Sequence, residues 1–252
     1  MDKRTTLHYL IGTFLVTYIM WGIIIIANQI GYLPYGTPLS MIFYVIGGNA
    51  PPIIAYVVLK KAHKITGIKE FAKEAFAVKQ KPLFYGILLI FLTLYFGVPA
   101  IMQGVSRGIP IYIGLLYLPL MILLGGLEEL GWRYILQTSL EKRLPFGTAT
   151  SLTAGIWAMW HLPLFFMKGT VQSTWNFGIF VIMVFGMAFA LATILRLSKS
   201  IWLCILFHSM ANGLTASWVI EDSLRIRTVT TLSIILISSL MVTFYQRRRF
   251  QI

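Results

Sequence analysis

The chain has 252 residues, of which 58% are hydrophobic and 12% charged, and its mean hydropathy is +0.79. Because a soluble domain carries about 25% charged residues, this composition excludes an ordinary soluble protein and predicts a single integral membrane domain over residues 1–252. The net charge of +13 does not indicate a nucleic-acid-binding protein, since the Lys and Arg residues lie in short loops between apolar runs and form no continuous basic face.

A transmembrane helix requires about 20 mostly apolar residues, and runs of about that length follow one another along the chain. The sequence therefore predicts an all-α polytopic bundle of about eight transmembrane helices, the first of which is a retained helix and not a removed signal peptide. Proline, glycine and asparagine interrupt several of these runs, which indicates a bundle with a polar interior. The predicted spans are residues 8–29, 37–59, 83–104, 110–132, 147–167, 175–195, 200–218 and 228–246.

The placement of positive charge predicts the orientation. If the N-terminus is cytoplasmic and eight spans alternate, most of the 21 Lys and Arg residues lie on the cytoplasmic side, and the outer segments hold only Arg107, Lys168, Arg225 and Arg227. Cytoplasmic loops carry an excess of Lys and Arg. The sequence thus predicts that both termini are cytoplasmic, in a multi-pass protein of the cell membrane, with a bacterial plasma membrane as the expected location.

The segment 61–81, between the second and third spans, is too polar to cross a membrane. Its apolar residues recur at helical spacing between lysines and glutamates. This pattern is typical of a basic amphipathic helix on the inner leaflet, and a solvated cytoplasmic loop fits it equally well. The apolar positions are Ile65, Ile68, Phe71, Ala72, Ala75 and Phe76.

Ionisable residues inside the spans indicate function, because each costs about 2.5–3.5 kcal/mol at a helix centre. Near the end of the fourth span lie Glu128, Glu129 and Arg133. Glu129 and Arg133 are spaced i, i+4 and can form an ion pair. Glu128 lies about 100° around the helix and has no local cation, so in a desolvated pocket it suits a general acid or base. The alternative is an ion-pair cluster that merely anchors the helix near the cytoplasmic surface.

Two later spans add further polar groups. His161 lies in the fifth span, and His208 and Asn212 lie four apart on one face of the seventh. Each residue alone is equally well explained by hydrogen bonds between helices. Together with Glu128 they supply the groups that activate water and stabilise an oxyanion. The single cysteine, Cys204, is predicted to be a small packing residue.

Three motifs in this region resemble those of the CPBP family of CAAX proteases and bacteriocin-processing enzymes, which includes the eukaryotic ras-converting enzyme. EExxxR, FxxxH and HxxxN are matched, in this order, by EELGWR at 128–133, WAMWH at 157–161 with Trp in place of Phe, and HSMAN at 208–212. The resemblance covers about residues 120–215. One departure is Tyr134, where many relatives have Gly.

The resemblance implies an intramembrane endopeptidase that hydrolyses a peptide bond of a membrane-associated substrate, such as a prenylated C-terminus, a leader peptide or a fragment of a membrane regulator. It also implies the roles of the motif residues. Glu128 and His161 would activate water, while His208 and Asn212 would stabilise the oxyanion. Arg133 would organise the neighbouring glutamate or meet a carboxylate of the substrate.

The family has been described both as metalloproteases and as glutamate-type proteases without a metal, and the sequence favours an enzyme without a cofactor. It lacks the HExxH helix that indicates zinc, and Asn212 suits an oxyanion hole better than a metal shell. The alternative is a zinc site made by Glu128, His161 and His208, since two histidines, a glutamate and a water are a known catalytic set.

Two other functional classes fit parts of the pattern. A proton-coupled transporter also places Glu and His inside a bundle, but it would move a solute and cut no peptide. A non-enzymatic immunity or scaffold protein would bind a partner peptide and keep its effect when Glu128 is replaced. The clustering of polar residues in three motifs favours the peptidase. The predicted partners are a peptide or protein substrate and the lipid bilayer, and no nucleic acid is expected. The sequence does not predict an oligomeric state.

Overall fold

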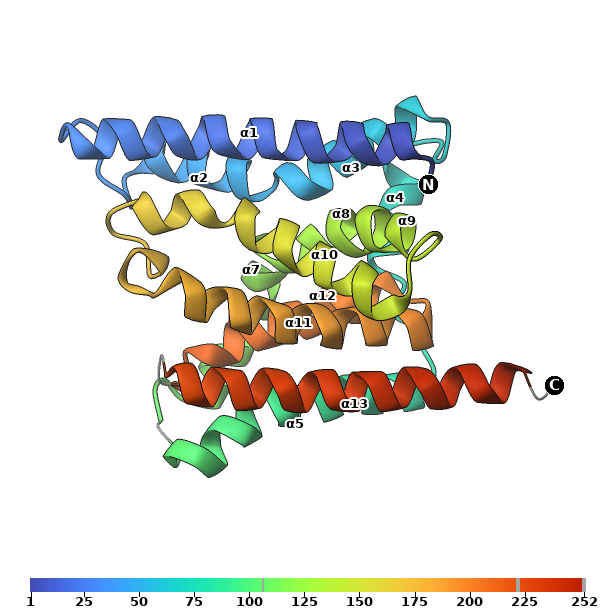
Figure 1. Cartoon of the computed structure of the whole chain (residues 1–252). Coiled ribbons are helices and arrows are strands. Elements are labelled where there is room, and N and C mark those ends of the chain that lie inside the picture. The colour runs from blue at the N-terminus through green and yellow to red at the C-terminus, as the bar shows by residue number, and fades with distance from the viewer. Residues whose placement is uncertain (106, 221–222, 251–252) are drawn as a thin grey trace.

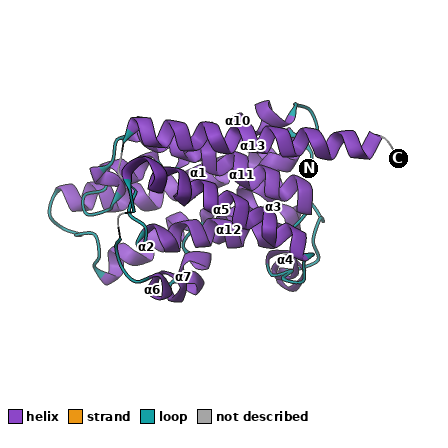
Figure 2. Ribbon diagram, turned by 90° about the horizontal axis from the view of Figure 1, so that it is seen from below, coloured by secondary structure: helices purple, strands orange, loops and turns teal. Residues whose placement is uncertain are grey.

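The structure is a computed structural model that describes residues 1–105, 107–220 and 223–250. Over these residues every regular element is a helix, apart from one isolated bridge between Arg107 and Trp218 (Figure 2). The all-α fold predicted from the apolar runs is thereby confirmed.

Four helices are long and apolar enough to cross a membrane singly, and one bent pair is long enough when its halves are joined. The pair bends by 48° at Asn49, directly before Pro51 and Pro52, because proline has no N–H to continue the hydrogen bonds of the preceding turn. The single helices are α1 (Lys3–Gln29), α5 (Pro82–Gln103), α11 (Phe177–Ser198) and α13 (Leu224–Phe250), and the pair is α2 (Pro38–Gly48) with α3 (Ala50–Lys61). Eight spans stay a prediction.

The other three predicted spans are helical but short or broken, and they are the three that carry the motifs. The helix α12 has 15 residues, a rise of about 22 Å, which is less than the roughly 30 Å of a hydrocarbon core. The elements of these regions are α6 (Ile111–Leu116), α7 (Leu118–Leu123), the 3₁₀ turn η1 (Gly126–Glu128), α8 (Glu129–Gly131), the π-helical η2 (Trp132–Gln137), α9 (Thr138–Leu140), α10 (Phe146–Trp160), the 3₁₀ turns η3 (Leu162–Phe166) and η4 (Gln172–Thr174), and α12 (Ile201–Thr215).

The motif-bearing helices lie inside the bundle. In Figure 1, α1 lies along one side and α13 with α5 along the other, with α10, α11 and α12 between them. The helix α12 packs against α5, α7, α11 and η1. Its inner residue Cys204 is fully buried, as predicted. Neighbouring helices thus shield α8, η2 and α12, which explains how these short segments persist in an apolar protein.

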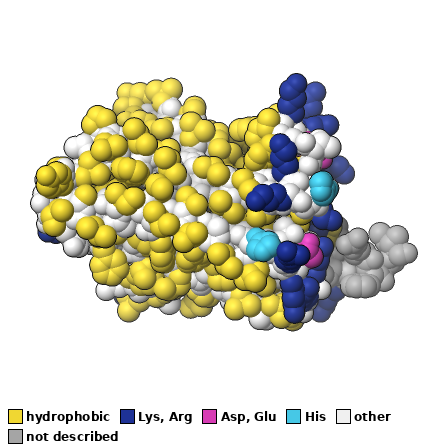
Figure 3. Space-filling model, turned by 90° about the horizontal axis from the view of Figure 1, so that it is seen from above, with side chains coloured by type: hydrophobic (Ala, Val, Ile, Leu, Met, Phe, Trp, Pro, Cys, Tyr) yellow, Lys and Arg dark blue, Asp and Glu magenta, His cyan; other side chains and the backbone are white. Residues whose placement is uncertain are grey.

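Positive charge gathers at one end of the molecule. Figure 3 shows Lys and Arg side chains at that end, and a mainly hydrophobic surface over the rest of the same face. Both termini lie at this end (Figure 1). The helix α4 (Ile68–Ala75) lies there too, with Phe71 and Ala75 buried against the bundle and Phe76 exposed. Of the two alternatives for segment 61–81, a helix is present over Ile68–Ala75, while its contact with the inner leaflet and the orientation of the termini stay predictions.

Candidate active site

Two consecutive glycines bring the EExxxR segment directly against α12. A Cβ atom on Gly125 would lie 2.6 Å from Nδ2 of Asn212 and 3.5 Å from Nε2 of His208. A Cβ atom on Gly126 would lie 2.2 Å from Oγ of Ser209 and 2.9 Å from a backbone oxygen of α12. A side chain at Gly126 would press on the backbone of α12, whereas one at Gly125 would displace the Asn212 amide. The two glycines thus allow the close approach that joins the first motif to the third.

The two glycines should respond differently to alanine. We expect Gly125→Ala to displace the Asn212 amide and to lower kcat by roughly 10²-fold, because a displacement of about 1 Å in an active site can cost that much. The midpoint of thermal unfolding should change little. We expect Gly126→Ala, which presses on backbone, to lower the free energy of unfolding by about 1–3 kcal/mol. Peptide hydrolysis and thermal unfolding of the two purified variants test this. Native kcat in Gly125→Ala would contradict the placement of Asn212 beside the reacting group.

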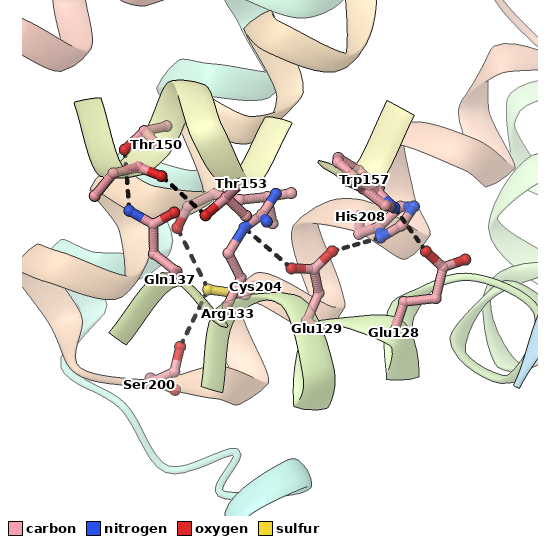
Figure 4. A network of polar contacts seen from close by, with 12 residues as sticks. Glu128, Glu129, Arg133, Gln137, Thr150, Thr153, Trp157, Ser200, Cys204 and His208 are labelled. Atoms are coloured by element: carbon pink, nitrogen blue, oxygen red, sulfur yellow. Dashed lines mark hydrogen bonds and ion pairs between the residues drawn. The ribbon is translucent and has the colours of Figure 1, made fainter. Parts of the chain in front are cut away.

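Glu129 joins the first motif to the third through a buried ionic network (Figure 4). Its Oε2 lies 3.2 Å from Nε of Arg133, and its Oε1 lies 2.8 Å from Nδ1 of His208. The Glu129 and Arg133 side chains are 0% exposed, and the Arg133 guanidinium lies 5.0 Å from the ring centroid of Trp157. The ion pair predicted from the i, i+4 spacing is confirmed. The contact with His208 was not predicted, because 79 residues separate the two.

The contact with Glu129 determines how His208 can act. A carboxylate only accepts hydrogen bonds, so Nδ1 of His208 carries the hydrogen and donates it to Glu129. Nε2 of His208 lies on the side of Gly125 and Asn212. A second partner that fixes the ring and its tautomer in this way is typical of functional histidines.

Trp157 has two contacts that hold Glu128 and His161. Its indole Nε1 donates to Oε2 of Glu128 at 3.0 Å, and its backbone oxygen accepts from Nδ1 of His161 at 2.9 Å. Since the carbonyl can only accept, Nε2 of a neutral His161 has no hydrogen and is free to take a proton. His161 caps α10 at its C-terminal end, two residues before Pro163. The sequence indicated Trp157 only as the aromatic residue of a motif, although a buried indole N–H generally requires an acceptor.

All four residues predicted to be catalytic line one cavity of about 490 Å³, namely Glu128, His161, His208 and Asn212. Glu128 is only 7% exposed. Much of the remaining wall is aromatic, and apolar walls strengthen the electrostatic interactions of the buried polar groups. Glu129 and Arg133 are buried. Their ion pair is the contact that the first of the two predicted roles of Arg133 requires, and both roles stay predictions.

A metal ion requires several ligand side chains close together. Among the residues that the structure describes, no three His, Cys, Asp or Glu side chains come together as metal ligands require. Glu128 is held by the indole of Trp157 and His208 by Glu129. The zinc set of Glu128, His161 and His208 is thus not assembled in this structure, although Nε2 of His208 and Oε1 of Glu128 lie outside these two contacts. The metal-free enzyme and the zinc alternative both stay predictions.

Known proteins share the segment that builds this cavity. The family model described as "Type II CAAX prenyl endopeptidase Rce1-like" matches residues 110–214, which include all three motifs. The "CAAX prenyl protease 2" of Methanococcus maripaludis is 28% identical over 228 residues, and the alignment covers 81% of each chain. The chain is related to the Rce1-like endopeptidases. The resemblance predicted from the three motifs is thereby confirmed.

The similarity to the Rce1-like endopeptidases indicates that the chain is a protease, and hence a hydrolase. Together with the apolar helices it indicates a multi-pass membrane protein. The Methanococcus relative is archaeal, so a bacterial source stays a prediction.

Proposed function

We propose that this protein is an intramembrane endopeptidase that cuts a prenylated peptide or protein at the membrane, with Glu128 and His161 activating the attacking water. The observation that carries the proposal is the convergence of Glu128, His161, His208 and Asn212, from three separate segments, on one cavity. The class of substrate follows from the printed names of the family and of the archaeal relative. A leader peptide is the second candidate substrate.

The hydrolytic step divides between two pairs of residues. Glu128 takes a proton from water, with Nε2 of His161 as the second acceptor, and the water oxygen attacks the carbonyl carbon of the scissile bond. The carbonyl electron pair moves to its oxygen. When this intermediate collapses, the carbon–nitrogen bond breaks and the leaving amine receives the proton from the acid formed in the first step.

The developing oxyanion is stabilised by Asn212 and His208. The Asn212 amide donates directly. His208 already donates from Nδ1 to Glu129, so it can donate from Nε2 only as the imidazolium. The Glu129 carboxylate favours that charged form, in the way a buried acid supports a histidine in other hydrolases. Glu129 is therefore a positioning residue that acts through His208.

Asn212→Ala should lower kcat by about 10²–10³-fold, or roughly 3–4 kcal/mol, with little change in KM, because the lost hydrogen bond forms only in the transition state. Asn49→Ala is the matched control, since Asn49 lines the same cavity but its amide donates to Val45 O of its own helix. Steady-state kinetics of both variants test this. A rise in KM at constant kcat would assign Asn212 to substrate binding instead.

The proposal includes eight spans with both termini in the cytoplasm. Topology reporters fused after Ile252 and within residues 61–81 should both give a cytoplasmic signal, because Lys and Arg side chains gather at one end of the molecule (Figure 3) and both termini lie at that end (Figure 1). A reporter in the 168–174 loop should give the opposite signal. An external signal from either of the first two fusions would refute the orientation.

The function is tested with purified protein in lipid nanodiscs. The probes are a farnesylated fluorogenic peptide, the same peptide without the lipid, and a leader-type peptide. We expect the native protein to cut the farnesylated peptide fastest and to keep its activity in chelator. If the protein moves a solute across the bilayer and cuts no peptide, it is a transporter. If it binds the peptides and cuts none of them, it is a scaffold protein. Loss of activity in chelator, with recovery on adding zinc, would refute the metal-free mechanism and leave the peptidase.

A further inference from the structure

A buried arginine shares the cavity with the proposed catalytic residues. In the sequence, Arg227 counts as one of the few positive charges outside the cytoplasmic segments. The structure instead places it in the first turn of α13, 7% exposed, where it lines the same cavity as His208 and Asn212. The guanidinium is therefore a feature of the cavity and is distinct from the exposed charge of Arg225, two residues earlier in the same helix.

Within the described parts of the chain, Arg227 forms no ion pair. Its Nη2 donates one long hydrogen bond, of 3.5 Å, to the backbone oxygen of Ile220. Two other arginines differ in this respect. Arg133 lies 3.2 Å from a carboxylate oxygen of Glu129, and Arg196 lies 2.6 Å from one of Glu141. The Tyr95 hydroxyl is a further hydrogen-bond partner of the Arg227 side chain. A guanidinium has five N–H donors, so these two neutral partners leave donors free and supply no negative charge.

A cation in such a place is costly unless an anion accompanies it. Ionisable residues inside membrane proteins therefore usually mark a ligand or an ion pathway. The planar guanidinium matches a carboxylate in shape and charge, and the two can form a pair of parallel hydrogen bonds. Among the described residues no carboxylate pairs with Arg227, and Glu221 and Asp222 lie outside them. Because Arg227 faces the cavity that holds Glu128 and His161, we infer that the carboxylate belongs to a molecule that enters this cavity.

The cavity is long enough to join the two sites by a peptide. Its wall on α12 runs from His208 to Thr215, and seven residues of helix rise about 10 Å. This length equals about three residues of extended peptide at about 3.3–3.6 Å each. The start of α13, whose first turn contains Arg227, lies toward the end of the bundle opposite the two termini (Figure 1). A bound peptide can thus run from the proposed catalytic residues toward Arg227.

We propose that Arg227 binds a carboxylate of the substrate, either its C-terminal carboxylate or an acidic side chain, and so determines which bond reaches Glu128. The inference rests on the proposed function, because it assigns a specificity residue to the same cavity. Arg227 takes no part in the bond-breaking step. Its loss should therefore change KM and peptide preference much more than kcat.

The experiment compares three farnesylated peptides of one sequence: the free C-terminal acid, the C-terminal amide, and the amide with a glutamate as its last residue. Binding to Glu128→Gln in nanodiscs is measured by fluorescence polarisation, so that no cleavage is needed. We expect the acid to bind roughly 10- to 100-fold more tightly than the amide, as a hydrogen-bonded charge pair gives. Tight binding of the glutamate peptide would show that a side-chain carboxylate also serves.

Variants of Arg227 and Arg225 test whether Arg227 is the residue that prefers the free acid over the amide. In the Glu128→Gln background, Arg227→Gln should abolish the difference between acid and amide, and Arg227→Lys should keep part of it because the charge remains. Arg225→Gln, which removes the same charge from an exposed position, should keep all of it. If the acid is not preferred with Arg227 present, or if the preference persists in Arg227→Gln, the inference is wrong.

The native protein separates this inference from the proposed function. Hydrolysis of acid and amide with the same KM would refute the carboxylate site and support the peptidase. Preferential binding of the acid by a protein that cuts none of the three peptides would refute the peptidase and support the carboxylate site.

Discussion

Glu128→Gln should lower hydrolysis of the farnesylated peptide by about 10²–10⁴-fold, the usual contribution of a positioned acid or base. The amide has nearly the same shape as the carboxylate, and its oxygen can still accept from Nε1 of Trp157, so the contact seen at 3.0 Å is kept. It cannot take a proton from water. Because Glu128 is 7% exposed, replacing its charge with a neutral group removes a desolvation cost. The folded state should therefore be at least as stable as in the native protein.

The measurement is the hydrolysis rate per mole of protein that elutes as a single folded species, together with the midpoint of thermal unfolding. Glu74→Gln is the matched control, since Glu74 is exposed at the Lys-rich end and should keep native activity. Native activity in Glu128→Gln would refute the proposed base. Loss of both activity and folding would mean that Glu128 is structural, the alternative considered from the sequence.

Glu129→Gln should have the largest effect on stability, about 3–5 kcal/mol in the free energy of unfolding. Removing one member of a buried ion pair leaves the other charge without compensation, and Arg133 is 0% exposed. Activity should fall as well, because Nδ1 of His208 would lose the carboxylate that lies 2.8 Å away. Denaturant unfolding in a mild detergent gives the first quantity and peptide hydrolysis the second.

A double substitution separates the two roles of Glu129. In Glu129→Gln with Arg133→Met, the uncompensated charge is absent and an apolar chain takes its place, so stability should recover in part. Activity should stay low, since His208 still has no carboxylate partner. Recovery of activity together with stability would show that Glu129 serves the fold and does not position His208. Native stability in Glu129→Gln alone would show that the network does not stabilise the fold.

Local spacing is the part of the site that could be predicted. Glu129 and Arg133 are i, i+4 neighbours, as are His208 and Asn212, so helical periodicity alone places each pair on one face. Trp157 and His161 are also four residues apart, yet the backbone contact between them was not predicted, because it depends on the end of α10 near Pro163. Periodicity describes a continuous helix and gives no information on where the helix stops.

The chain's composition and apolar runs by themselves determined that it is a helical membrane protein, and its three motifs determined the family to which it is related. These properties are local, because the length of an apolar run and the order of polar residues do not depend on the rest of the fold. Only the tertiary structure decided that Gly125 and Gly126 let η1 approach α12, and that Glu129 meets His208 across 79 residues. Such contacts depend on packing between distant segments. For the same reason, only packing shows that Arg227 is a buried cation of the cavity, because burial depends on the neighbours of a residue and not on its position in the chain.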